Sequence, residues 1–164
     1  MKVIIIYESF FGNTQKVAQA SFDALAARCE VQILHIDEFK TELLKNCDLL
    51  IAGSPTRAFR PTPGIISCLK TIPDSVLTGI YVATFDTRIS ENSVNSFVRM
   101  MMKWFGYAAK PLSNLLHRKG GLLLTNPEGF IVNGTEGPLA DQELTRVKSW
   151  AIHLIELLSE KRKL

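Results

Sequence analysis

Short apolar segments alternate with amphipathic segments along the whole chain. The apolar segments lie at residues 3–7, 31–36, 48–54, 79–85 and 120–126. Most of them are continuously apolar rather than alternating, which is typical of strands that are covered on both faces of a sheet. We therefore expect five buried β-strands.

The segments between these strands have the spacing of helices. Apolar side chains recur three and four positions apart in residues 13–28 and again in residues 144–158. Strands that alternate with helices predict an α/β sandwich, in which a parallel sheet lies between two helical layers and the crossovers are right-handed. The chain has no repeat or linker, so we expect a single domain over residues 1–164.

The connection between the fourth and fifth strands is the longest. Gly106 and Pro111 divide it, which predicts one helix near residues 91–105 and another near 112–118. The methionine-rich end of the first helix, residues 100–105, has helical spacing and is expected to belong to the core.

Composition and charge exclude several classes of protein. The chain has 164 residues, of which 46% are hydrophobic and 21% charged, and its net charge of +3 is too small to indicate a nucleic-acid partner. Three cysteines without a C-x-x-C spacing indicate neither a disulfide framework nor a metal site. No apolar run approaches the roughly 18 residues of a membrane span, and no signal segment is recognisable, so we expect a cytoplasmic protein.

A polar, glycine-containing loop joins the first strand to the first helix. It runs from Ser9 to Thr14 and contains Gly12 and Asn13. A helix begins with backbone N–H groups that lack intrahelical partners and with the positive end of its dipole, so small hydroxyl and amide side chains there favour an anion. The loop therefore predicts a phosphate site.

Two further loops are expected at the same edge of the sheet, because a ligand of an open α/β sheet lies beyond the carboxyl ends of the strands. They follow the third strand, at residues 54–61, and end the fourth, at residues 84–88. These loops contain the planar side chains Phe59 and Phe85 together with several charged groups. A phosphate site beside planar contacts suits a mononucleotide.

The loop sequence S-F-F-G-N-T resembles the flavodoxin phosphate loop, usually T/S-x-T-G-N-T, and the strand layout is similar to that family over nearly the whole chain. The resemblance implies a flavodoxin-like three-layer sandwich with a five-stranded parallel sheet in the order 2-1-3-4-5. It also implies that FMN is the cofactor and that the protein carries electrons between two redox partner proteins, a reductase and an acceptor enzyme. The segment 129–139 resembles a turn of some small flavodoxin-like proteins, and we expect it to connect the fifth strand to the last helix.

By the same resemblance the cofactor-binding residues fall into two groups, and no catalytic side chain is implied. The phosphate would be held by Ser9, Phe10, Phe11, Gly12, Asn13 and Thr14. The isoalloxazine ring would be flanked by Pro55, Thr56, Arg57, Ala58, Phe59, Arg60, Thr84, Phe85, Asp86, Thr87 and Arg88.

The chain departs from the flavodoxin pattern in its ring-flanking loops. They lack Trp and Tyr, and Arg57, Arg60 and Arg88 stand where flavodoxins usually carry carboxylates. One cation about 8 Å from the reduced, anionic cofactor is worth roughly 2 kcal/mol at an effective dielectric constant near 20. We therefore expect reduction to be easier than in a flavodoxin surrounded by acidic residues.

Other functions remain open to different degrees. An NAD(P)H-dependent quinone or flavin reductase of the same fold is the main alternative, because arginines beside a flavin suit a nucleotide phosphate or an anionic acceptor. A signalling receiver is disfavoured because the third strand ends in Ala52-Gly53-Ser54, without the required acids. Neither a P-loop nor a G-x-G-x-x-G fingerprint occurs.

Overall fold

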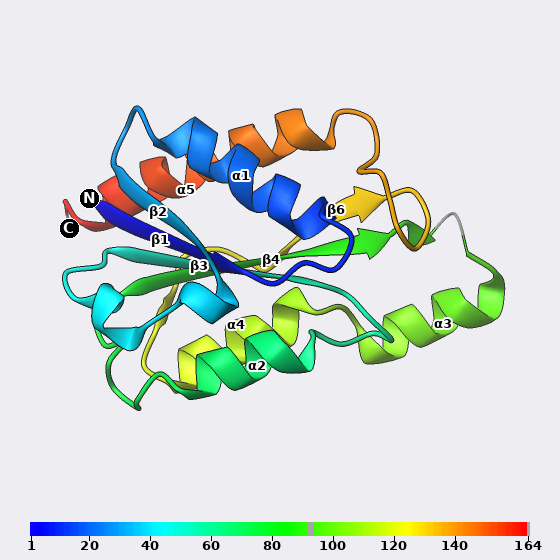
Figure 1. Ribbon diagram of the computed structural model, residues 1–164, viewed down its shortest axis with the longest axis horizontal. Coiled ribbons are helices and arrows are strands. Elements are labelled where there is room, and N and C mark those ends of the chain that lie inside the picture. The colour runs from blue at the N-terminus through cyan, green and yellow to red at the C-terminus, as the bar shows by residue number, and fades with distance from the viewer. Residues whose placement is uncertain (92–93, 164) are drawn as a thin grey trace.

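The computed structural model describes residues 1–91 and 94–163, and shows a sheet between two helical layers (Figure 1). The strands are β1 (Lys2–Tyr7), β2 (Glu30–His35), β3 (Leu49–Pro55), β4 (Tyr81–Ile89), β5 (Leu122–Leu123) and β6 (Glu128–Val132). The α-helices are α1 (Asn13–Leu25), α2 (Pro63–Lys70), α3 (Ser96–Phe105), α4 (Ala109–Arg118) and α5 (Glu143–Lys161). Short 3-10 helices occupy Ile36–Glu38 and Thr41–Leu44.

The sheet confirms the predicted parallel order. Strands β2, β1, β3, β4 and β5 lie side by side in that sequence, and each neighbouring pair is parallel. The helices α1 and α5 cover one face, and α2 and α4 cover the other (Figure 1). The fold is therefore the predicted flavodoxin-like sandwich.

The edge strand differs from the prediction. Only Leu122 and Leu123 of the predicted strand at 120–126 pair with the beginning of β4, and β6 then pairs with the end of β4, from Phe85 to Ile89. The segment 129–139 is therefore not only a connection, because its first residues belong to this strand. The break between β5 and β6 contains Pro127, which has no N–H to donate to a sheet.

Residues of the central strands alternate between two cores, which explains their continuous apolar sequence. In β1, Val3 and Ile5 pack in the core shared with α1 and α5, whereas Ile4 and Ile6 pack in the core shared with α2 and α4. All four side chains are fully buried. Burial of both faces requires apolar residues at every position.

The α3–α4 segment also departs from the prediction. The structure begins α3 at Ser96, whereas the helix was expected from residue 91, and residues 92 and 93 of that expectation lie outside the described residues. Gly106, at φ 75°, ends α3 as predicted. Pro111 does not precede α4 but lies in its first turn, where a proline costs no intrahelical hydrogen bond.

The expectation that residues 100–105 form core is wrong for most of the side chains described. Met102 is buried, but Met100 and Trp104 are 48% and 83% exposed. In the part of the chain that the structure describes, none of the helices combines the length and apolarity that crossing a membrane requires.

Candidate functional site

A cleft of about 270 Å³ opens at the carboxyl ends of β1, β3 and β4. Its walls come from the loop after β1, the loop after β3, the end of β4 and the segment that follows β6. The lining residues are Ser9, Phe10, Phe11, Asn13, Thr14, Pro55, Thr56, Arg57, Ala58, Thr87, Arg88, Ile89, Val132 and Thr135. The three loops that the sequence analysis placed at one sheet edge therefore all contribute to one cleft.

The beginning of α1 presents donors that nothing else in the described chain uses. Gly12, at φ 80°, precedes the helix, and no side chain among the described residues caps it. The Lys16 N–H donates to the Gly12 carbonyl at 2.9 Å, so the N–H groups before it have no intrahelical partner. The buried hydroxyl of Ser9 likewise has no hydrogen-bond partner within the described residues. Unpaired donors and a helix dipole favour an anion at this place.

Two hydrogen bonds hold this helix start against the rest of the cleft. Asn13 Nδ2 donates to the Glu136 carbonyl at 2.8 Å, and the Thr14 and Thr87 hydroxyls lie 2.9 Å apart. Asn13 and Thr14 are both buried. The phosphate loop is therefore fastened to β4 and to the segment after β6.

The loop after β3 contains a tight turn whose two central residues have positive φ. Arg57 and Arg60 exchange backbone hydrogen bonds of 2.9 and 3.0 Å across Ala58 (φ 46°) and Phe59 (φ 66°). Such a turn ordinarily contains glycine or asparagine at its centre, because other side chains are strained at positive φ. The strain is stored in a turn whose Arg57 and Ala58 line the cleft.

Arg57 places its charge over the aromatic rings of the phosphate loop. Its guanidinium carbon lies 4.8 Å from the centre of the Phe10 ring and 5.9 Å from that of Phe11. Both rings are about half exposed, at 54% and 46%. A cation over the face of a ring is attracted by the ring's quadrupole, so these contacts hold Arg57 at the cleft.

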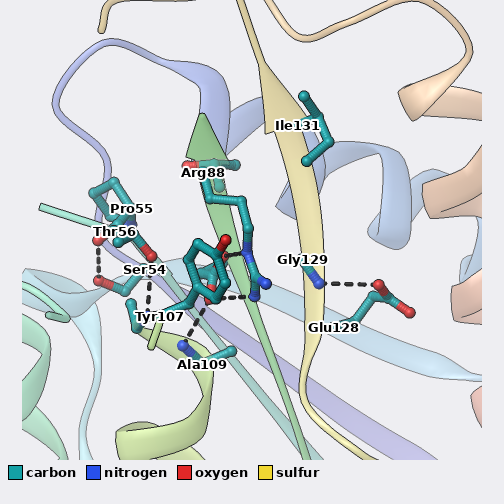
Figure 2. Close-up of polar contacts among 12 residues, drawn as sticks. Ser54, Pro55, Thr56, Arg88, Tyr107, Ala109, Glu128, Gly129 and Ile131 are labelled. Carbon is teal, nitrogen blue, oxygen red and sulfur yellow. Dashed lines mark hydrogen bonds and ion pairs between the residues drawn. The ribbon is translucent and has the colours of Figure 1, made fainter. Parts of the chain in front are cut away.

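A buried ion pair lies at the end of β4, and of its two members Arg88 lines the cleft whereas Asp86, also predicted to flank the ring, does not (Figure 2). Arg88 Nε and Nη2 donate to the two carboxylate oxygens of Asp86 at 2.5 and 2.7 Å, and the Ala109 N–H donates to the same carboxylate at 2.8 Å. Asp86 is fully buried. Burial raises the pKa of the Asp86 carboxyl, while the hydrogen bond and charge of Arg88 act in the opposite direction.

Several predicted ring contacts do not reach the cleft. Phe85 is fully buried and packs edge to face with Phe130 and Trp150 in the core under α1 and α5, so the prediction that it flanks a ring is wrong. The Thr84 hydroxyl, also buried, donates to the Ala109 carbonyl at 2.9 Å. Both residues lie further from the carboxyl end of β4 than Thr87 and Arg88, which line the cleft from the two faces of the strand.

In the loop after β3, too, only some of the predicted residues line the cleft. Arg57 and Ala58 line the cleft, whereas Phe59 and Arg60 line a separate hollow with Pro61, Ile66 and Pro111. The aromatic side chains at the cleft are Phe10 and Phe11, which the sequence analysis had assigned to the phosphate. Phe59 and Phe85 therefore do not supply the planar walls that were expected.

The sequence analysis missed three cleft residues, Ile89, Val132 and Thr135. Ile89 ends β4 one residue beyond the predicted loop, and Val132 ends β6. A signal for the other side of the cleft was present in the segment 129–139, which resembles a turn of small flavodoxin-like proteins. The described residues contain no cluster of His, Cys, Asp and Glu that could hold a metal ion.

Comparison with known proteins identifies the fold. No protein-family model and no curated protein matches the chain. An archaeal flavodoxin of solved structure is 20% identical with a TM-score of 0.75, and the match covers 97% of this chain and 99% of that one. Flavodoxin 2 from Bacillus cereus is 22% identical with a TM-score of 0.72, over 95% and 99% of the two chains.

A larger protein contains a similar unit. Rubredoxin oxygen:oxidoreductase from Desulfovibrio gigas is 18% identical with a TM-score of 0.75, and the match covers 99% of this chain but only 37% of that one. Together these likenesses show that the chain has the flavodoxin fold, as its sequence predicted.

Proposed function

We propose that this chain is a single-domain, cytoplasmic flavodoxin-like protein that binds FMN in the cleft and carries electrons between a reductase and an acceptor enzyme. The observation that supports this most strongly is the buried Ser9 hydroxyl. It has no partner among the described residues and stands before a helix whose first N–H groups are also unpaired. A phosphate would accept hydrogen bonds from the Ser9 hydroxyl and from these N–H groups.

The rest of the cleft suits the ring of FMN. Ile89 and Val132 supply apolar surface from β4 and β6, and Phe10 and Phe11 supply aromatic rings from the phosphate loop. Arg57 supplies a positive charge held over those two rings. Bound FMN would supply the reversible uptake of electrons, and the side chains would bind it, orient it and exclude water.

The side chains of the cleft favour a carrier over an enzyme that uses acid–base residues. The described lining contains no carboxylate, histidine or cysteine, so it offers no general acid or base near neutral pH. Its two charged groups are arginines, of which Arg88 is already paired with Asp86.

Binding of FMN and of riboflavin to the flavin-free protein tests the proposal, with the visible spectrum recorded for the FMN complex. The two ligands differ only in the phosphate. We expect FMN to bind about 100-fold more tightly or better, since two or more charge-assisted hydrogen bonds are lost with riboflavin. Equal affinities, or no binding of either ligand, would refute the site.

A steady-state assay separates the carrier from the reductase. The FMN-loaded protein is mixed with NADPH and a quinone, and NADPH oxidation is followed. A carrier requires a separate reductase, so we expect no turnover by the isolated protein. Sustained turnover would instead support an NAD(P)H-dependent quinone reductase.

A further inference from the structure

Helix α3 turns a stripe of large apolar side chains toward solvent. Phe97, Met100 and Trp104 are 66%, 48% and 83% exposed, and Trp104 is among the most exposed large apolar side chains described. At 3.6 residues per turn they lie within about 60° of one another around the helix axis. Met102, which is buried, lies on the opposite side. We call Phe97, Met100 and Trp104 the α3 stripe.

The charge around this stripe is positive. Residues 96–105 contain Arg99 and Lys103 and no carboxylate, and Lys103 is exposed. The nearest carboxylate in sequence among the described residues, Glu91, accepts a hydrogen bond from the Tyr107 hydroxyl at 2.6 Å.

More cations follow at the carboxyl end of α3. The loop after β3 is fastened there by the hydrogen bond from the Ala108 N–H to the Thr56 hydroxyl, 2.9 Å long. This loop contributes the exposed side chains of Arg57 and Arg60, and Lys110 is exposed at the beginning of α4. In Figure 1, α3 lies at the end of the molecule, beyond the carboxyl ends of β3 and β4. The stripe and these cations therefore belong to the cleft end of the molecule.

We propose that the α3 stripe and its surrounding cations dock this protein reversibly on an anionic lipid surface. Aromatic and methionine side chains on one face of a helix, with Lys and Arg outside that face, are the pattern of helices that lie in the membrane interface. Trp is favoured at that depth because its ring is amphipathic. Anionic lipid headgroups would balance cations that no carboxylate of the helix balances.

Two other occupants fit the stripe less well. In a second copy of this chain, stripe against stripe would bring the exposed Lys103 side chains, which border the stripe, toward each other, and the helix has no carboxylate to offset the repulsion. A protein partner would need a groove that matches projecting side chains. Lipid needs no matched shape, and α3 lines none of the hollows described around the cleft.

Sedimentation with vesicles tests the proposal on the 164-residue chain as it is purified, whether or not it carries FMN. Vesicles of phosphatidylcholine alone are compared with vesicles containing roughly one-third phosphatidylglycerol. We expect partitioning onto the anionic vesicles to be at least about ten-fold higher, and to fall as salt is added. Trp emission should shift to the blue on binding, because Trp104 is exposed whereas Trp150 is 9% exposed.

Variants of exposed residues locate the contact. The double variant Phe97→Ser with Trp104→Ser should lower partitioning at least about ten-fold. Binding buries the apolar area of both aromatic rings in the lipid interface, and the variant lacks that area. The matched control is Leu122→Ser with Leu144→Ser, which changes residues that are 44% and 45% exposed on other elements. It should bind as wild type does.

Charge is tested separately. Lys103→Glu should lower partitioning more than about five-fold, and Lys148→Glu, on α5, should leave it unchanged. Trp104→Phe should still bind but lose the emission shift.

Three results would overturn the proposal. They are equal partitioning onto the two kinds of vesicle, equal losses in the stripe and control variants, and sedimentation velocity showing that the wild type self-associates through the stripe. Absence of vesicle binding together with specific binding of an acidic protein would also overturn it and would make the stripe a protein interface. None of these results depends on whether FMN binds in the cleft.

Discussion

The guanidinium carbon of Arg88 lies 3.7 Å from the centre of the Tyr107 ring (Figure 2). The contact joins the end of β4 to the connection between α3 and α4. Tyr107 continues the link by donating to Glu91, and Arg99 of α3 donates from Nε to the Glu91 carbonyl at 3.0 Å. One chain of contacts therefore runs from the wall of the cleft to the helix that carries the α3 stripe.

Replacing Arg88 should destabilise the fold through Asp86. Arg88→Gln leaves a buried carboxylate without its cation, and breaking such a pair costs about 3 kcal/mol. Urea unfolding at neutral pH measures this loss. Arg28→Gln removes an exposed arginine and should change the free energy of unfolding by no more than about 0.5 kcal/mol.

The loss of stability in the Arg88→Gln variant should depend on pH. Burial already raises the pKa of Asp86 above its ordinary 3.8, and removal of Arg88 raises it further. The folded variant then retains a proton that the unfolded chain releases, so its stability falls as pH rises from about 3.8 through the raised pKa. The difference from wild type should therefore be smaller in acid than at neutral pH. A pH-independent difference would contradict this explanation.

Removing the Ser9 hydroxyl should weaken FMN binding without weakening the fold. The hydroxyl has no partner among the described residues, so Ser9→Ala should leave the free energy of unfolding unchanged or raise it by up to about 1 kcal/mol. Affinity for FMN should fall about ten-fold or more, while affinity for riboflavin stays the same. Thr125→Ala is the matched control, because the Thr125 hydroxyl is also buried without a partner in the described part of the chain but lies outside the cleft.

Gly137 should tolerate no side chain, because it packs against Asn13. A Cβ at Gly137 would collide with the Asn13 side-chain amide, whereas a Cβ at Gly134 would meet nothing within 4 Å. Both glycines have positive φ, at 101° and 80°, so both alanine variants carry strain of about 1 kcal/mol. Gly137→Ala should lose about 1–3 kcal/mol more and should also weaken FMN binding. Equal losses in unfolding experiments would show that the contact with Asn13 does not matter.

Ala58→Gly should stabilise the protein. Ala58 has φ 46°, and a non-glycine residue there costs about 1–2 kcal/mol, which exceeds the entropy of about 0.5–1 kcal/mol that glycine loses on folding. We expect a higher melting temperature, equivalent to about 0.5–1 kcal/mol. Ala26→Gly, at φ −57°, should instead lower it by a similar amount. A lower melting temperature in both glycine variants would mean that the turn at Ala58 is not strained.

The effect of arginine on reduction should come mainly from Arg57. Arg57 lines the cleft and has no carboxylate partner among the described residues, Arg88 is paired with Asp86, and Arg60 lines another hollow. Arg57→Gln should lower the midpoint potential of bound FMN by tens of millivolts, with about 90 mV per electron as the upper bound. Arg60→Gln should have a smaller effect. A potentiometric titration at low and high salt measures both, and the Arg57 effect should shrink as salt screens the charge.

The sequence predicted the class of fold and the edge of the sheet that carries the cleft. Continuous apolar strands such as residues 3–7 require two covering layers, and parallel strands bring their carboxyl ends to one edge. The start of α1 at Asn13 and the donors before it were also visible, because a helix start depends on local residues. The role of residues 128–132 as a strand was not visible, since their pairing with β4 is a long-range contact.

What the tertiary structure alone decided is the direction and pairing of individual side chains. Phe85 and Arg88 are three residues apart on one strand, yet the first lies in the core and the second borders the cleft. Similarly, Met102 and Trp104 are two residues apart on α3, yet the first is buried and the second is exposed. The apolar pattern determines that a segment is a strand or a helix, because that depends on periodicity along the chain. Which face meets protein, cofactor or solvent depends on neighbours that are distant in sequence, and only the packed structure places those neighbours.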